Sequence, residues 1–182
     1  MTATNSARAD DIPPATLKFI TAIASDCTQF DVQAIQTVRF RDPMETGTQA
    51  GEITLYQVPC NGGAYNIFDR WVLKDPYGAL MPLSFATPVF KTEYEDPSEG
   101  AKLKSISVTS FTAVADIGAS SFDPKTLTLT SFFKKRGLGD AHESGAWTFE
   151  NGTFVLQRYT VDPTYDGAVN PITIWSRDDS NP

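Results

Sequence analysis

Apolar and polar residues alternate with a period of two in several short segments of this chain. The alternation is clearest at 53–56, 106–109 and 127–130. Successive side chains of a β-strand point to opposite faces, so this pattern predicts strands with one buried and one exposed face. Asn151-Gly152 separates two further strand-like runs. This dipeptide favours a type I′ turn, because both central residues of that turn need positive φ, and it therefore predicts a hairpin.

Turn signals punctuate the rest of the sequence. Asp-Pro dipeptides begin at residues 42, 75, 96, 123 and 162. The aspartate carboxylate caps a turn and proline presets φ, so these dipeptides separate strands. We expect a mainly β (α+β) fold, an antiparallel meander that forms a barrel or a sandwich.

One segment near the N-terminus has a different period. Leu17, Ile20, Ala24 and Cys27 follow one another at three- and four-residue steps after Pro14. Proline suits the first turn of a helix, and nothing inside the segment breaks the pattern. The sequence predicts one N-terminal amphipathic helix that begins at Pro14 and has Cys27 at its end, within a single β-rich domain of residues 10–182.

The charge and the cysteine content exclude several classes of protein. The chain has 15 Lys and Arg, 22 Asp and Glu, and a net charge of −7. A protein that binds a phosphate backbone needs a surplus of cations, so we expect no nucleic acid partner. Two Cys and one His are too few for a four-ligand zinc site, and we predict no metal and no cofactor. No apolar run approaches 18 residues, so no transmembrane segment is expected.

Residues 1–9 have two interpretations. Ala7-Arg8-Ala9 is a small-x-small triplet of the kind that signal peptidase cuts after. The segment is then the remaining tail of a signal peptide. The alternative is a disordered polar terminus, because such triplets also arise by chance.

Cys27 and Cys60 also allow two interpretations. They lie 33 positions apart, which is unlike a CxxC redox motif or a paired metal-ligand spacing. In an oxidising compartment they form one disulfide. In a reducing one they are two buried thiols that act as small apolar residues.

A few residues are candidates for chemistry or binding. His142, the single histidine, lies between the carboxylates Asp140 and Glu143 and near Ser144, which suggests a hydrolase, although the Gly-x-Ser-x-Gly nucleophile motif is absent. Arg136 and Asp140 flank a glycine-containing bend and are expected to pair across it. They are also candidates for binding.

The segment 62–66, Gly62-Gly63-Ala64-Tyr65-Asn66, is a second candidate for binding. Its glycines suit a turn. We regard Tyr65 and Asn66 as possible binding residues and a purely structural turn as the alternative.

Three stretches and the residues that follow them carry a family resemblance: Val58 to Asn66, Phe122 to Phe132, Lys135 to Asp140, and then Trp147, Gly152, Phe154 and Pro171 to Trp175. Together they resemble the bacterial envelope family called domain of unknown function 1176, over residues 52–176. The resemblance implies an exported protein, periplasmic or secreted, from a cysteine-rich family without an established activity.

The resemblance also bears on the cysteines. Cys60 matches a family cysteine, so its partner in this chain is expected to be Cys27. Two further family cysteines are replaced here by Ala141 and Tyr165. Their joint absence is expected if those two cysteines pair with each other in the family.

Three functions follow as hypotheses. The first is a non-enzymatic or inhibitor-like module that binds a macromolecular partner in the cell envelope. That partner is a basic protein, which suits the acidic charge, or a cell-wall component. The second is an envelope hydrolase that uses His142 with a carboxylate. The third is a structural envelope protein that oligomerises, and the sequence leaves the oligomeric state open.

Overall fold

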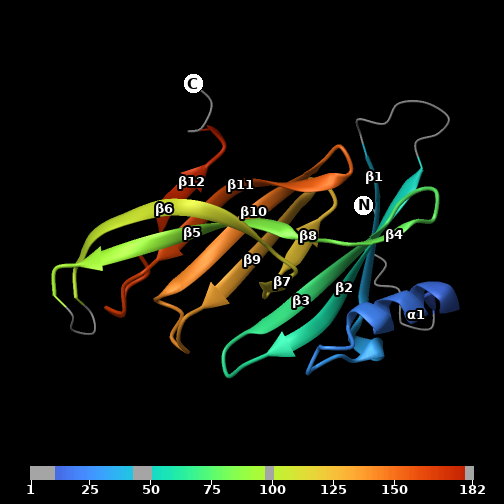
Figure 1. The fold of residues 1–182 in the computed structure, drawn as a ribbon, viewed down its shortest axis with the longest axis horizontal. Helices are drawn as coiled ribbons and strands as arrows, with labels where there is room; N and C mark the ends of the chain where they lie inside the picture. The colour runs from blue at the N-terminus through green and yellow to red at the C-terminus, as the bar shows by residue number, and fades with distance from the viewer. Residues whose placement is uncertain (1–10, 43–50, 97–100, 179–182) are drawn as a thin grey trace.

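The computed structural model describes residues 11–42, 51–96 and 101–178 (Figure 1). Residues 1–9, with their two interpretations, lie outside the described residues. The elements follow one another in this order: α1 (Pro14–Ile23), a 3-10 turn (Val32–Ala34), β1 (Gln36–Arg41), β2 (Glu52–Gly62), β3 (Ile67–Lys74), β4 (Leu80–Pro82), β5 (Phe85–Tyr94), β6 (Leu103–Val114), β7 (Asp116–Gly118), β8 (Ser121–Asp123), β9 (Thr128–Lys134), β10 (His142–Glu150), β11 (Thr153–Asp162) and β12 (Ile172–Ser176).

The strands form two five-stranded antiparallel sheets and a two-stranded ribbon. The first sheet has the order β1-β2-β3-β4, and β7 also pairs with β3. The second sheet has the order β12-β11-β10-β9-β8, and β5 pairs with β6 in the ribbon. Neighbouring strands are mostly consecutive in the chain, which confirms the predicted antiparallel meander. Because both sheets of the described chain are open, the fold is sandwich-like and not a closed barrel.

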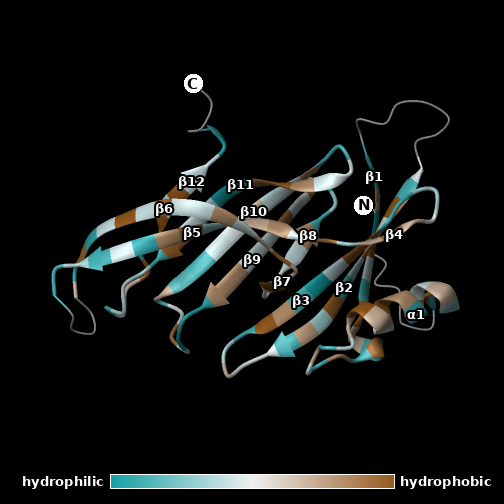
Figure 2. Cartoon of the chain, viewed as in Figure 1, coloured by the Kyte–Doolittle hydropathy of each residue, from teal (hydrophilic) through white to brown (hydrophobic). Residues whose placement is uncertain are grey.

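The predicted hairpin forms at Asn151-Gly152. Both residues have positive φ, 50° and 83°, and β10 pairs with β11 on either side of them. Of the segments predicted to alternate, 106–109 does so in β6, with partly buried and exposed residues in turn. Residues 53–56 in β2 are all buried, so the prediction of an exposed face is wrong there. Buried and less buried residues also alternate along β10 and β11. Figure 2 shows the corresponding alternation of apolar and polar residues along the strands.

Two apolar clusters hold the layers together. The larger one lies between the two five-stranded sheets and includes Trp71 of β3 and Trp147 of β10, which are 0% and 1% exposed. Phe85 at the start of the ribbon belongs to the same cluster. The smaller cluster joins α1 to the opposite face of the first sheet, where Ile20 meets Val58 and Val72. The first sheet is therefore covered on both faces, which accounts for the continuous burial along β2.

The helix begins at Pro14 as predicted but ends at Ile23, before Cys27. The amide of Cys27 donates to the carbonyl of Ala24, 3.0 Å away, and not to that of Ile23. The Ile23 carbonyl instead accepts a hydrogen bond from the Arg70 guanidinium of β3. A side chain from another element thus takes the place of the next helical hydrogen bond, and the predicted helix is too long by four residues.

None of the helices in the described ranges is both long enough and apolar enough to cross a bilayer.

Candidate functional site

Cys27 and Cys60 form a disulfide, which confirms the predicted pairing. Cys60 is fully buried in β2, and its carbonyl accepts a hydrogen bond of 2.9 Å from the amide of Gln29. The bond therefore attaches the segment after α1 to the first sheet. No free thiol remains in the described chain, so neither cysteine is a nucleophile in this state.

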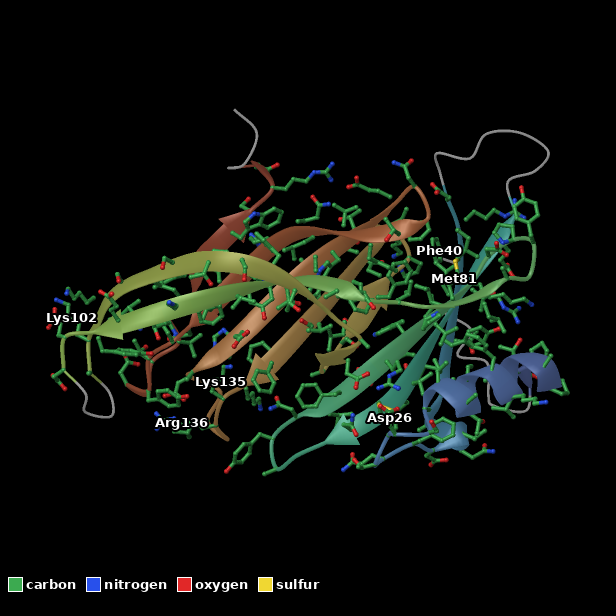
Figure 3. The ribbon with its side chains drawn as sticks, viewed as in Figure 1. Asp26, Phe40, Met81, Lys102, Lys135 and Arg136 are labelled. Atoms are coloured by element: carbon green, nitrogen blue, oxygen red, sulfur yellow. A yellow bond between two sulfur atoms is a disulfide. The ribbon has the colours of Figure 1, made fainter. Side chains whose placement is uncertain are left out.

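An ion-pair network next to the disulfide was not foreseen from the sequence. Arg70 of β3 contacts the carboxylates of Asp26 and Asp116, each at 2.7 Å. These hydrogen bonds hold the pKa of Asp26 below its usual range and that of Arg70 above its usual range. Asn61 extends the network, because its amide donates to Asp116 at 3.2 Å. The Arg70 charge is paired with two carboxylates of the protein itself, which indicates a structural role. Figure 3 labels Asp26 beside the helix.

Three loops meet at one end of the sandwich, and they contain the motif residues singled out above. Asn66, in the β2–β3 turn, donates to the Lys134 carbonyl at 2.8 Å and accepts from the Lys134 amide at 2.8 Å. The Tyr65 ring lies against Gly137, where an added Cβ would lie 2.9 Å from the ring. Figure 1 shows the β2–β3 turn beside the β9–β10 loop at the lower edge. We call residues 63–67, 134–140 and 163–172 the three-loop end.

Arg136 and Asp140 pair across the bend between β9 and β10. The guanidinium donates to both carboxylate oxygens, with Nε 2.8 Å from Oδ1. Gly139 has a φ of 74°, which favours glycine and lets the chain turn between the two residues. Arg136 also lies 5.3 Å from the centre of the Tyr165 ring. Figure 3 shows Lys135 and Arg136 at this end of the molecule.

Asp140 connects the β9–β10 loop to the β11–β12 loop. Its Oδ2 accepts a hydrogen bond of 2.9 Å from the amide of Gly167, and the residue is only 2% exposed. The hydrogen bonds from Arg136 hold the pKa of Asp140 well below its usual range. Asp162, 1% exposed, holds the other side of the same loop through the amides of Thr164 and Asn170. Two buried carboxylates therefore order the β11–β12 loop.

His142, the candidate catalytic residue, is the first residue of β10 and is only 5% exposed. Its Nδ1 lies 3.1 Å from the Gly139 carbonyl and 2.9 Å from the Asp140 carbonyl. Carbonyl oxygens only accept, so Nδ1 carries a proton and donates. The ring also packs on Phe132, with centroids 4.8 Å apart. These contacts involve backbone oxygens and an aromatic ring, and none of them is with the carboxylate that the hydrolase hypothesis pairs with His142.

Glu143, next to His142, belongs to a second polar cluster that sequence reasoning missed. Tyr159 of β11 donates to its Oε2 at 2.6 Å, and Lys135 forms an ion pair with its other oxygen. Burial raises the pKa of Tyr159 above its usual range, and the Glu143 charge adds to this effect. Only the pairing of β10 with β9 and β11 brings these side chains together. No three His, Cys, Asp or Glu side chains in the described segments are grouped to hold a metal ion.

More than half of the exposed large apolar side chains of the described chain lie at the three-loop end. The described chain exposes eleven large apolar side chains, and six of them lie here. They are Tyr65, Ile67, Leu138, Tyr165, Val169 and Ile172. Leu138 is the most exposed of these, at 78%. Asn66, Asp140 and His142 are thus occupied by internal hydrogen bonds, whereas apolar groups face the solvent.

The buried Arg136–Asp140 pair has a consequence at acid pH. A carboxylate whose pKa is depressed in the folded state contributes stability fully above its ordinary pKa of 3.8. That contribution is lost as the pH falls through the lower folded-state value. We expect Asp140→Asn to be less stable than the wild type at neutral pH, and the difference to shrink on acidification.

Urea midpoints measured from neutral to acid pH check this expectation, with the exposed Asp11 carboxylate replaced in Asp11→Asn as the control. A gap between Asp140→Asn and the wild type that stayed constant with pH would contradict it.

Comparison with known proteins shows the family of this chain. Residues 2–177 match the family described as "Protein of unknown function (DUF1176)". The chain belongs to this family. The match confirms the resemblance read over residues 52–176 and extends it to the N-terminal helix and Cys27.

A curated relative of this DUF1176 chain is "Uncharacterized protein YpfG" of Escherichia coli (strain K12). The two are 26% identical over 142 residues, which cover 74% of this chain and 36% of the relative. The chain therefore spans about a third of that relative's length. No solved structure matches this chain.

The DUF1176 resemblance implies that relatives carry two cysteines at the positions of Ala141 and Tyr165. The fold shows where these two positions lie. Ala141 directly follows Asp140, whose carboxylate bonds the Gly167 amide, and Tyr165 packs on Arg136. The two positions thus lie on loops that contact each other. In this DUF1176 chain those loops are held by Arg136 and Asp140, without a covalent bond.

Proposed function

We propose that this DUF1176 chain is an exported, non-enzymatic module of the bacterial cell envelope that binds a partner through the three-loop end. The single observation that carries the proposal is the convergence of the motif loops. Their polar side chains are consumed in holding the loops together, and their apolar side chains face outward. An exposed apolar cluster of this kind marks an interaction surface on a protein.

The disulfide bears on the cellular compartment of the protein. Disulfides persist in secreted and periplasmic proteins and are rare where thioredoxin and glutathione keep thiols reduced. The Cys27–Cys60 bond therefore supports a periplasmic or secreted location.

The net charge bears on the partner. At −7 the chain favours a basic protein over an acidic one. A cell-wall component is the other candidate, and it follows from the compartment. An inhibitor-like role fits the same surface, because binding alone would suffice to block a partner.

Binding to isolated cell envelopes tests the proposal. Purified oxidised protein is mixed with envelopes and sedimented. We expect the wild type to sediment, and Tyr65→Ser with Leu138→Ser together to lower the bound fraction by about tenfold, as the loss of a central contact does. Tyr77→Ser is the matched control, because Tyr77 is also 78% exposed but lies in the β3–β4 turn, at the opposite end of β3.

Equal sedimentation of the wild type and the Tyr65/Leu138 variant would contradict the proposal. Equal loss in Tyr77→Ser would also contradict it, since binding would then not be located at the three-loop end.

A further inference from the structure

The three-loop end differs in charge from the rest of the molecule. Its residues include three cations, Lys134 to Arg136, and two carboxylates, Asp140 and Asp166, a net charge of +1. Because the whole chain carries −7, the remaining residues carry −8. Two of the three cations also have internal partners, since Arg136 pairs with Asp140 and Lys135 with Glu143 of β10. The net-charge argument for a basic partner therefore does not apply at this end.

The apolar residues of this end are mostly aliphatic and lie on separate loops. Ile67, Leu138 and Val169 are 56%, 78% and 66% exposed, one on each of the three loop segments. Tyr65 and Tyr165 lie on the same loops and are 57% and 37% exposed. Aliphatic tips accompanied by tyrosines and cations are typical of segments at a membrane surface, where Tyr lies at the headgroup level.

We propose that the three-loop end docks on the surface of a lipid bilayer in the envelope. This inference rests on the proposed function and specifies its partner. The aliphatic side chains enter the boundary between headgroups and acyl chains. Lys134, Lys135 and Arg136 lie at the level of the lipid phosphates, and the acidic remainder of the chain is directed away from an anionic surface.

The loops are held in place before docking. Asn66 bonds the backbone of Lys134 at both its amide and its carbonyl, and Asp140 bonds the Gly167 amide. The three segments are therefore joined to one another and not only to their own strands. Little conformational entropy is lost when an already ordered surface docks, which favours binding by a small apolar patch.

Co-sedimentation with pure lipid vesicles tests the inference. The probes are vesicles of phosphatidylcholine alone and of phosphatidylcholine with phosphatidylglycerol in equal amounts. We expect the wild type to bind both and to bind the anionic vesicles only slightly more tightly, because two of the three cations are already paired with Asp140 and Glu143. Leu138→Asp should lower the partition coefficient by about tenfold or more, since an apolar side chain that leaves water contributes at least that factor.

Tyr77→Asp is the matched control, because it places the same charge at a side chain of the same exposure, 78%. It should partition like the wild type, and a thermal melt shows that both variants are folded. Absence of vesicle binding by the wild type, or an equal loss in Tyr77→Asp, would overturn the inference.

A second arm separates this inference from the proposed function. Envelopes are extracted with detergent to remove lipid, and binding to the remaining protein and cell wall is measured. Loss of binding on delipidation supports the bilayer as the partner. Binding that persists there, with none to vesicles, overturns the bilayer and leaves the proposed function standing with a protein or cell-wall partner.

Discussion

The double substitution Cys27→Ala and Cys60→Ala should lower the free energy of unfolding by about 3.5–4 kcal/mol, the loop-closure value for the separation of the two cysteines. The disulfide closes a loop across 33 positions, and the open chain gains the corresponding entropy when it unfolds. Urea unfolding followed by tryptophan fluorescence measures the loss. Reduced wild type should match the double variant, and a loss below about 1 kcal/mol would show that the bond constrains the unfolded chain little.

The loss should also be localised. Gln29 and the Arg70 network hold the same segment as the disulfide, between the helix and the first sheet. Amide hydrogen exchange should therefore accelerate in α1 before it does in β10 and β11. Equal acceleration in α1 and in β10 and β11 would contradict this, because the disulfide joins the segment after α1 to β2 of the first sheet.

Trp147→Ala is expected to have an effect of similar size, about 3–5 kcal/mol, as is typical when a buried tryptophan is truncated. Trp147 is 1% exposed, and its ring centroid lies 5.5 Å from that of Phe85. Its indole nitrogen donates to the Ala86 carbonyl at 2.9 Å. Both contacts are with β5, so the substitution removes a large part of the attachment between the ribbon and the second sheet.

Trp175→Ala serves as the control for Trp147→Ala. Trp175 is only partly buried, and its ring contacts Phe111, which is 50% exposed, with centroids 5.9 Å apart. The chemical change is the same but the cavity is smaller, so the loss of stability in urea should be clearly smaller. Equal losses in the two variants would contradict the larger effect expected from the deeper burial of Trp147.

Features that depend on neighbouring residues could be predicted from the sequence. The hairpin at Asn151-Gly152 was predicted because positive φ is a property of those two residues. Arg136 and Asp140 were expected to pair because four residues around a glycine bend bring their side chains within reach. The alternation at 106–109 agrees with the burial along β6, whereas that at 53–56 does not, because both faces of β2 are covered.

The helix end shows where local reasoning stops. Pro14 starts the helix through its own geometry, and the pattern continues to Cys27. The Ile23 carbonyl nevertheless bonds Arg70, which lies 47 positions along the chain. Nothing in the residues near Ile23 signals that contact.

The candidate site depended even more on the tertiary structure. Sequence reasoning singled out Tyr65, Asn66, Arg136, Asp140 and His142 but did not place the first two beside the others. Packing of the first sheet against the second brings Asn66 to Lys134, 68 positions away, and strand pairing in the second sheet brings Asp140 to Gly167, 27 positions away.

The sequence by itself thus determined the antiparallel strands, their turns and the start of the helix, because these follow from interactions between near neighbours. The tertiary structure alone decided which loops meet and which polar groups are consumed there. It also decided which side chains remain facing the solvent, because long-range contacts are set by strand pairing and by packing between the sheets.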